Sequence, residues 1–406
     1  MKLLRLSSKQ MAKIYDRSSF RNRRLQSTVR KIVEDVRLNG DEAVLKYTKK
    51  FDGVSLKARQ MKISESETSG AFQDIDPKFI SALKAVIENI TKFYSKRARK
   101  SWRMRSDDGA VLGQICRPIE KVGVYVPSGT VPLVSSVYMT VLPARIAGVK
   151  EIYLVTPPNK YKSINPHILA VANLLKVNGI YKAGGAQGIA ALAFGTKTIP
   201  KVDKIVGPGN QYVTEAKRQV FGYVDIDMVA GPTELVIIAN RYANPEYIKS
   251  DLEAQGEHYR GYPILITESK KMAKAFKNDP MDGYVILVRN MDEAAEVSNR
   301  IAPEHLQIMV KRPQRLLKKI TNAGAIFVGN YTPTAVGDYV AGPSHVLPTG
   351  GTARFFSGLG IDDFIKSSHM LSYSKRSLEK VKDYIEIISK LEGLSKHMES
   401  VDVRFK

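Results

Sequence analysis

The fold of this 406-residue chain is indicated most directly by the stretch 202-VDKIVGPGN-210. It contains a short β-rich run, Lys204–Val206, and the glycine-rich turn Gly207-Pro208-Gly209-Asn210 follows at once. Glycines let a ligand approach the backbone, and turns at the carboxyl ends of parallel strands are where α/β proteins bind their ligands. The stretch therefore predicts a strand that leads into a ligand-binding loop.

The same pattern of a strand followed by a turn occurs at two other places. The run Val122–Val126 leads into Pro127-Ser128-Gly129, and a short strand precedes Gly184–Gly195, where glycines open an apolar helix. Taken alone, Gly184–Gly195 is equally compatible with a tight turn that packs a helix on a sheet, because its spacing differs from the usual dinucleotide fingerprint. Three such turns together favour a nucleotide-binding crevice.

Strand-like and helix-like segments alternate over about 200 residues, which predicts parallel sheets covered by helices. The predicted strands are Val122–Val126, Ile152–Thr156, Lys204–Val206, Leu235–Ile238, Ile264–Thr267, Val285–Val288, Leu306–Val310 and Ala325–Val328. So many strands are too many for one sheet, so we expect two α/β units. The residues before about 105 are helical in pattern, with a break at Asn39-Gly40-Asp41 and a helix capped by Asp76. After residue 360 we expect no strand, a helix over Lys375–Lys396 and an extended tail over Val401–Lys406.

The charge of the chain is its unusual property. Lys and Arg total 63 and Asp and Glu 40, a formal net charge of +23. Such an excess suggests a nucleic-acid or anionic-surface binder. However, the first 105 residues carry most of it, and the sequence has no helix-turn-helix, RNP-like or zinc-finger pattern, so a solvated basic surface is the preferred interpretation.

Cysteine usage and hydropathy narrow the class of protein further. The single cysteine, Cys116, excludes an internal disulfide framework. The first residues lack the apolar core of a signal peptide, and no run of about 18 uncharged apolar residues occurs. We therefore expect a cytoplasmic protein.

Several acid/base and metal-ligating side chains form short clusters in the sequence. Gln255 and His258 are three residues apart in a helical stretch, which places them on one face. Carboxylate, imidazole and amide groups together suit zinc or another divalent ion without any thiolate, and Asp338, His345 and His397 add to that set. Glu304-His305 is a pair of adjacent acid/base candidates at an expected loop-to-strand junction.

These segments together resemble the histidinol dehydrogenase family from about Gly40 to the C-terminus. The motifs that carry the resemblance are 122-VGVYVP-127, Gly184–Gly195, 202-VDKIVGPGN-210, 213-VTEAK-217, 230-AGPTE-234, 255-QGEH-258, 302-APEHL-306, and 337-GDY-339 with 345-HVLPT-349. They occur in the same order along the chain, so together they are far more specific than any one of them.

The resemblance implies an α/β fold of two incomplete Rossmann-like domains with small helical N-terminal and C-terminal extensions. It implies oxidation of L-histidinol to L-histidine through an aldehyde-level intermediate with two NAD⁺, the last step of histidine biosynthesis. By motif position, the zinc ligands are Gln255, His258, Asp338 and His397, the acid/base pair is Glu304 and His305, and the NAD contacts are Tyr125, Gln187 and Asn210. The implied substrate contacts are Thr233, His345 and Glu392, in addition to the zinc ligands and His305.

The resemblance also implies an assembly. Family members are homodimers in which the C-terminal segment completes the partner's site, so each subunit would hold one zinc ion and share its active site. We expect residues 1–20 to form an N-terminal extension, 21–124 with 234–360 a first α/β domain, 125–233 a second, NAD-binding domain, and 361–406 the C-terminal extension. Two positions depart from the family pattern, with Thr233 in place of serine and Gly256 in place of alanine.

The residue types suit this chemistry, and two alternatives stay open. His305 is the natural base for the alcohol proton, Glu304 for the water that attacks the aldehyde, and Glu392 can pair with the substrate ammonium. One alternative is a related zinc- and NAD-dependent dehydrogenase that acts on another small alcohol, against which Glu392 and His345 argue. The other is a nucleic-acid-binding protein on an inactive scaffold, which would be expected to have lost the zinc ligands or Glu304-His305.

Overall fold

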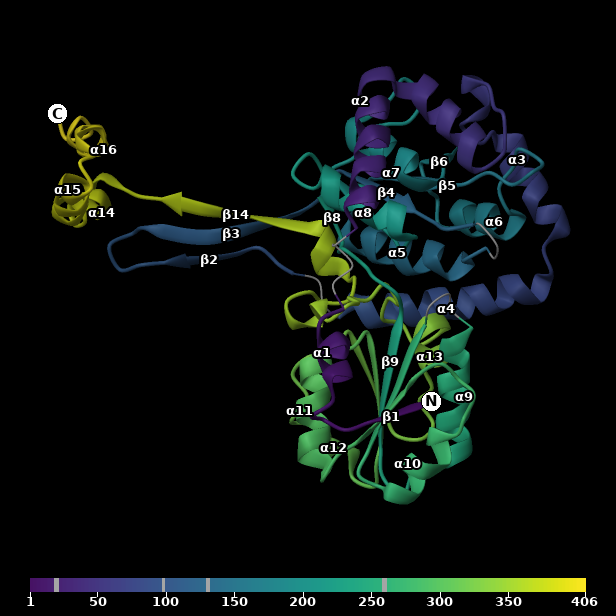
Figure 1. Ribbon diagram of the computed structural model, residues 1–406. Helices are drawn as coiled ribbons and strands as arrows, with labels where there is room; N and C mark the ends of the chain where they lie inside the picture. Colours follow the sequence, from purple (N-terminus) through teal and green to yellow (C-terminus); the bar gives the residue numbers. More distant parts are fainter. Residues whose placement is uncertain (18–21, 97–98, 129–131, 258–260) are drawn as a thin grey trace. The chain divides into compact units, whose positions relative to one another are not determined.

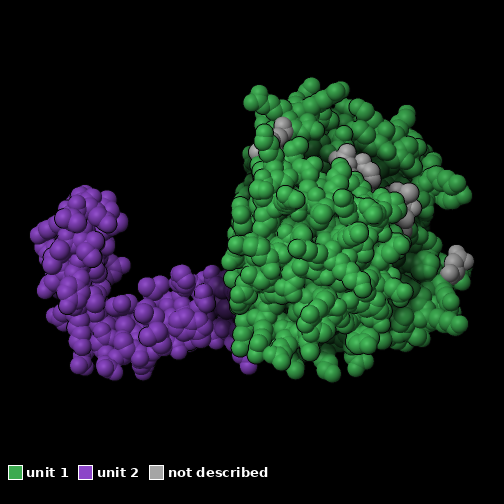
Figure 2. All heavy atoms as spheres, turned by 60° about the horizontal axis from the view of Figure 1, so that its bottom comes forward, with its two compact units in different colours: residues 1–97, 119–364 green, residues 98–118, 365–406 purple. Residues whose placement is uncertain are grey.

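The structure is a computed structural model that describes residues 1–17, 22–96, 99–128, 132–257 and 261–406. The chain forms two compact units, which Figure 2 distinguishes by colour. The first comprises Met1–Arg97 and Ile119–Phe364, and the second comprises Ala98–Pro118 and Ile365–Lys406.

The first unit contains a six-stranded parallel sheet (Figure 1). In spatial order its strands are β1 (Lys2–Leu4), β11 (Tyr284–Leu287), β10 (Tyr262–Thr267), β9 (Glu234–Ala239), β12 (His305–Met309) and β13 (Ala325–Val328). The middle strand β9 is buried along its whole length. Its side chains alternate between two apolar layers, with Val236 and Ile238 on one face and Leu235 and Ile237 on the other.

Helices cover both faces of this sheet, as parallel strands require. One face packs against α1 (Lys9–Tyr15), α11 (Met291–Ile301) and α12 (Pro313–Leu317), and the other against α9 (Pro245–Gly256) and α10 (Lys270–Lys277) (Figure 1). Asn244 caps α9 and Pro245 follows at its first position, so the start of this helix is encoded locally.

The first unit also contains a five-stranded parallel sheet. Its spatial order is β6 (Gly179–Lys182), β5 (Glu151–Thr156), β4 (Lys121–Tyr125), β7 (Lys204–Val206) and β8 (Asp225–Ile226). The strand order therefore reverses between β4 and β7, which is the kind of position where open α/β sheets bind nucleotides at the carboxyl ends of their strands. The confirmed strand Lys204–Val206 and its following loop lie at this reversal.

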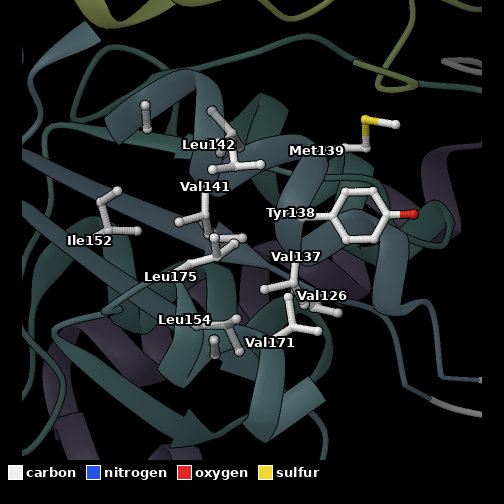
Figure 3. Close-up of a cluster of buried hydrophobic side chains, with 14 of the residues drawn as sticks. Val126, Val137, Tyr138, Met139, Val141, Leu142, Ile152, Leu154, Val171 and Leu175 are labelled. Atoms are coloured by element: carbon white, nitrogen blue, oxygen red, sulfur yellow. The ribbon is translucent and has the colours of Figure 1, made fainter. Parts of the chain in front are cut away.

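Two helical layers enclose the five-stranded sheet. One layer comprises α4 (Pro77–Ser95), α5 (Val134–Ala147) and α6 (Pro166–Leu174), and Figure 3 shows part of the apolar cluster they form with β4 and β5. The other comprises α2 (Arg23–Phe51), α7 (Gly185–Phe194) and α8 (Gln211–Val220). The expected helix break is confirmed, because Gly40 adopts a φ of 52° inside α2.

The remaining helical turns of the first unit are short. They are η1 (Ala58–Gln60), α3 (Glu65–Gly70), η2 (Ala71–Asp74), α13 (Thr334–Tyr339), η3 (Thr352–Arg354) and η4 (Ile361–Phe364). Within the described residues, no helix is both long and apolar enough to span a lipid bilayer.

The second unit is an antiparallel sheet followed by three helices. The sheet has the order β14 (Ile365–Ser372), β3 (Val111–Pro118) and β2 (Trp102–Arg105), and the helices are α14 (Lys375–Glu379), α15 (Lys382–Leu391) and α16 (Ser395–Asp402). The prediction that strands end by residue 360 is therefore wrong. The single helix expected over Lys375–Lys396 is divided. The last helix, α16, includes Val401 and Asp402, the first two residues of the tail that was expected to be extended over Val401–Lys406.

The packing also differs from the expected grouping of segments. Helices α2 and α4, within the range 21–124, pack against the five-stranded sheet, although that range was grouped with residues 234–360. Strand β4 pairs with β5 and β7, so residues 121–124 also belong to the five-stranded sheet. The domain boundaries themselves stay a prediction.

Candidate active site

The acid/base candidates lie at the amino ends of two neighbouring strands of the six-stranded sheet. Glu304 directly precedes β12 and His305 is its first residue, which confirms the expected loop-to-strand junction. Thr233 directly precedes β9, and Glu234 is the first residue of that strand. Because His305 pairs in register with Leu235, the two strand starts lie side by side.

A chain of hydrogen bonds holds the Glu304 carboxylate. The Thr233 hydroxyl donates to Glu304 Oε2 at 2.6 Å, and the main-chain N–H of Glu234 donates to the same oxygen at 2.9 Å. Gln255, on the last turn of α9, donates its amide Nε2 to the Thr233 hydroxyl at 3.2 Å. The threonine that replaces serine thus keeps a hydroxyl in the position that links Gln255 to Glu304.

The tautomer of His305 follows from its neighbours. Its Nδ1 lies 3.1 Å from the carbonyl oxygen of Glu234, and this oxygen can only accept, so Nδ1 donates. The opposite nitrogen, Nε2, lies 3.5 Å from Asp338 Oδ1. In the neutral ring, Nε2 is therefore the atom that can take up a proton, and Asp338 faces it.

Burial and charge shift the proton affinities of the pair. Burial raises the pKa of Glu304 to about 7, against the opposing influence of His305 and of the Thr233 hydrogen bond. Burial alone would lower the pKa of His305, but Glu304 and Asp338 outweigh it and raise that pKa to about 9. Glu304 consequently exchanges its proton near neutral pH, whereas the negative charges beside His305 favour the protonated form of its ring there.

A pocket of about 400 Å³ lies beside these groups. Asp338 and His345 line it, and Phe327 packs its ring 5.9 Å from the ring of His305. The loop that carries His345 is fixed by Tyr94 of α4, whose hydroxyl accepts from the Ser344 N–H at 2.9 Å. No local pattern predicts this contact of Tyr94, because it joins residues 250 positions apart in the sequence.

The expected metal ligands are only partly brought together in the first unit. Gln255 contacts Thr233, which binds Glu304, and Asp338 faces His305, so both candidate ligands are connected to the acid/base pair. His258 lies outside the described residues, and α9 ends at Gly256, before that position. His397, in α16, and Glu392, at the end of α15, belong to the second unit. In the described part of the chain, no three His, Cys, Asp or Glu side chains form a metal-binding group.

The described residues nevertheless suit a zinc ion. The Gln255 side chain is 4% exposed, and because its nitrogen donates to Thr233, its oxygen is directed away from that hydroxyl. An amide oxygen, a carboxylate and imidazoles are groups that zinc accepts. Gln255 and Asp338 can therefore serve as two of its ligands.

The three expected NAD contacts surround the strand-order reversal of the five-stranded sheet. The Tyr125 hydroxyl accepts from the Gly185 N–H at 3.1 Å, at the start of α7. Gln187, in the first turn of the same helix, is fully buried, and neither of its amide atoms has a hydrogen-bond partner among the described residues. Asn210 caps α8, its side-chain oxygen accepting from the N–H groups of Tyr212 and Val213.

Gly207 brings the loops after β4 and β7 together. It has a φ of 116°, and a Cβ atom at this position would lie 2.1 Å from the Tyr125 carbonyl oxygen. Lys217 and Asp227 form a buried ion pair that holds this loop. The Lys217 ammonium donates to the Gly207 carbonyl oxygen at 2.9 Å, and the Asp227 carboxylate accepts from the Gly207 N–H at 2.7 Å. Only glycine allows this close approach.

Comparison with known proteins gives consistent matches. A model of the family described as histidinol dehydrogenase matches residues 15–405, so the similarity begins earlier than the motifs after Gly40 indicate. Histidinol dehydrogenase from Listeria innocua is 47% identical over 410 residues, which cover 96% of this chain and 95% of that protein. The Listeria monocytogenes serovar 1/2a enzyme is 47% identical over 401 residues, 94% of this chain and 93% of that protein. The crystal structure of histidinol dehydrogenase from Elizabethkingia anophelis has a TM-score of 0.92 and 35% identity, covering 100% of this chain and 98% of that one.

Proposed function

Because the chain belongs to the histidinol dehydrogenase family, NAD-dependent oxidoreductases of the last step of histidine biosynthesis, we propose that it oxidises L-histidinol to L-histidine. The observation that carries this proposal is the contact chain from Gln255 through Thr233, Glu304 and His305 to Asp338. This chain joins a carboxyl group and an imidazole to Asp338, which lines the pocket. The four-electron reaction proceeds through an aldehyde-level intermediate.

His305 is the base for the alcohol proton. The Glu234 carbonyl holds Nδ1 as the donor, so the ring presents Nε2 toward the pocket side where Asp338 lies. A proton accepted at Nε2 is stabilised by the Asp338 carboxylate. NAD⁺, when bound, would supply the hydride acceptor, and the residues of the site would orient the substrate carbon toward it.

Glu304 is the base that activates water in the second oxidation. Its pKa of about 7 lies near the operating pH, where a general base is most effective. Thr233 and the Glu234 N–H both bind Oε2, so Oε1 is the oxygen left to accept a proton from water. The resulting aldehyde hydrate loses its hydroxyl proton and its hydride in the same way as the alcohol.

We propose Gln255, His258, Asp338 and His397 as the ligands of one zinc ion per subunit. Zinc, when bound, would hold the substrate through its nitrogen atoms and offset the Asp338 charge that raises the pKa of His305. The support is the donor chemistry of Gln255 and Asp338 beside the acid/base pair. Removal of the metal with a chelator should abolish turnover and should also lower the melting temperature, whereas full turnover by metal-free protein would contradict this assignment.

The remaining contacts belong to the same proposal. Tyr125, Gln187 and Asn210 bind NAD, as their position at the strand-order reversal supports. Thr233, His345 and Glu392 contact the substrate, and Glu392 pairs with its ammonium group. L-histidinol also contacts Gln255, His258, His305, Asp338 and His397.

We propose further that the chain is a cytoplasmic homodimer with shared active sites, in which Glu392 and His397 complete the partner's site. Mixing His397→Ala subunits with His305→Ala subunits tests this arrangement. Heterodimers with one intact site should recover part of the activity that both parent variants lack. Verified heterodimers without activity would contradict a shared site.

The decisive experiment counts NADH formed per L-histidinol consumed. Two NADH per substrate, with L-histidine as the product, is the expected result. One NADH per substrate, or turnover of a different small alcohol with none of histidinol, would favour the alternative of a related zinc- and NAD-dependent dehydrogenase with another substrate.

A further inference from the structure

The main chain of Glu234 contacts both members of the acid/base pair. Its N–H donates to Glu304 Oε2 at 2.9 Å, and its carbonyl oxygen accepts from His305 Nδ1 at 3.1 Å. One peptide segment thus sets the direction of the Glu304 carboxylate and the tautomer of His305. A small displacement of this segment would alter both groups at once.

The Glu234 side chain is buried and bound at two points by Arg17. Arg17 Nε lies 2.7 Å from Glu234 Oε1 and Nη2 lies 3.1 Å from Oε2, with side-chain exposures of 9% for the arginine and 3% for the glutamate. The Gly350 N–H donates to Oε1 at 2.9 Å. Three N–H donors, two from Arg17 and one from Gly350, therefore hold the Glu234 carboxylate.

Arg17 is in turn fixed by the main chain on two sides. Its Nη2 donates to the carbonyl of Ile301 at 2.8 Å, and its Nη1 donates to the carbonyl of Ile14 in α1. Ile301 ends α11, and the chain then reverses through Ala302 at a φ of 49° to reach Glu304. Arg17 consequently joins the two segments that deliver the acid/base pair, the start of β9 and the approach to β12.

Stability alone is a weak reason for such an arrangement. Two buried charges lose their hydration, and a well-packed apolar pair of similar size is often as stable. The planar guanidinium offers what an apolar pair lacks, which is directional contact with a carboxylate and with carbonyl groups together. The contacts of Arg17 with the Glu234 carboxylate and the Ile301 carbonyl are therefore suited to fixing the orientation of the chain at Glu234.

We propose that Arg17 and Glu234 are positioning residues for the acid/base pair, an inference that rests on the proposed function of Glu304 and His305. Neither side chain enters the described pocket. The pair acts through the Glu234 main chain, which it holds where Glu304 and His305 need it. Loss of the pair should therefore slow the chemical steps and leave substrate and NAD⁺ binding nearly unchanged.

The test compares Arg17→Lys with a matched control, Arg218→Lys. Arg218 forms the same kind of two-point pair, with Glu215 in α8, at 2.8 and 2.6 Å. Arg17→Lys should lower kcat about 10-fold with both KM values within about twofold of wild type, while Arg218→Lys should leave kcat within about twofold. A kcat for Arg17→Lys equal to that of the control would overturn the proposal.

A second pair of variants uses chemical rescue. Arg17→Ala should lose more activity than Arg17→Lys, and added methylguanidine should restore several-fold of it by occupying the vacated site. Arg218→Ala should show no such dependence. Rescue that is absent from Arg17→Ala protein shown to be folded by circular dichroism would count against the positioning role.

An activity-independent measurement separates this inference from the proposed function. In ¹⁵N-histidine-labelled protein, the chain's six histidines give few signals, and His305→Asn assigns that of His305. Its Nδ1 chemical shift should change in Arg17→Lys and stay unchanged in Arg218→Lys. An unchanged shift in Arg17→Lys refutes the positioning pair, whereas a wild-type protein that fails to oxidise histidinol refutes the proposed function instead.

Discussion

The two parallel sheets of the first unit share a strand order and carry their polar residues at opposite ends. Counted from β4, the five-stranded sheet has the order 3-2-1-4-5, and counted from β9, five strands of the other sheet repeat it, with β1 added at the edge. In the five-stranded sheet, Tyr125 and Gly207 lie at the carboxyl ends of β4 and β7. In the six-stranded sheet, Glu304 and His305 lie at the amino end of β12.

The two sheets share a strand order, yet their candidate functional residues lie at opposite ends of the strands, so the topology alone does not determine where these residues lie. Open α/β sheets bind ligands at the carboxyl ends of their strands, next to a strand-order reversal, and the proposed NAD contacts of the five-stranded sheet lie at that position. The acid/base pair of the other sheet lies where two strands begin, since main-chain groups of the first residue of β9 are available to both of its members. We therefore assign binding of the dinucleotide to one sheet and proton transfer to the other, and the following variants test that division.

The largest effect is expected for His305→Asn. Removal of the general base should lower kcat by about 10²–10⁴-fold, because no other described side chain replaces Nε2 beside Asp338. NADH binding, measured by fluorescence titration, should stay within about twofold, since the five-stranded sheet is untouched. His167→Asn is the matched control, because this histidine packs against Phe79 away from the acid/base pair. Weaker NADH binding with unchanged kcat would reverse the assignment of the two sheets.

A more selective effect is expected for Glu304→Gln. Glutamine keeps the size of the side chain but cannot take a proton from water, so oxidation of the aldehyde should fall by about 10²-fold and oxidation of the alcohol by much less. Reactions started separately from L-histidinol and from the aldehyde measure the two halves. In the wild type the aldehyde half should speed up as pH rises through about 7, where Glu304 loses its proton, and the variant should lack this rise. Equal losses in both halves would contradict the role of Glu304 as the activator of water.

Local sequence was sufficient to predict much of the two sheets. The buried strand β7 and the partly exposed strand β13 are short runs bounded by turns, and their predicted limits agree with the structure. The strands missed were those without such a pattern. β14 is mostly exposed along its length, and β1 has only three residues, so its place depends on pairing with β11.

The residues of the candidate site also divide into those that a local sequence pattern indicates and those that it does not. Glu304-His305 could be identified because the two residues are adjacent in the sequence, and Asp338 because it lies in a recognisable motif. Arg17 could not, since its partner Glu234 is 217 residues away and neither residue's surroundings in the sequence indicate the other. Contacts set by tertiary packing, such as this ion pair, carry no local signal in the sequence.

On the five-stranded side, Gly207→Ala should weaken binding of the dinucleotide. The new Cβ would meet the Tyr125 carbonyl, and the φ of 116° would add backbone strain, together about 1–3 kcal/mol. KM for NAD⁺ should rise about 10-fold while kcat at saturating NAD⁺ changes little. Gly222→Ala is the matched control, because Gly222 has a φ of 100° with nothing within 4 Å of its Cβ position. If both variants raise KM equally, strain and not the meeting of the two loops is responsible.

The smallest effect concerns Asp52, the counterpart of Glu304 on the five-stranded side. Burial raises the pKa of this carboxyl to about 6, and Oδ2 has no hydrogen-bond partner among the described residues. Its Oδ1 would lie 3.2 Å from a Cβ on Gly184, which places it beside the start of α7. Glu304 and Asp52 are thus both carboxyl groups whose charged form is disfavoured by burial, which is complete for Glu304 and partial for Asp52.

Asp52→Asn should reveal this penalty through its pH dependence. A folded-state pKa above the unfolded value of about 3.8 means that the native protein retains the proton longer, so wild type loses stability as pH rises from about 4 to 6 and then stays at the lower level. Relative to wild type, the variant should therefore gain about 1–2 kcal/mol of unfolding free energy between pH 4 and pH 8, a value reduced for the partial exposure of the group. Denaturant unfolding at both pH values measures this difference. A difference between variant and wild type that does not change with pH would show that Asp52 ionises as it does in water, and the parallel with Glu304 would then fail.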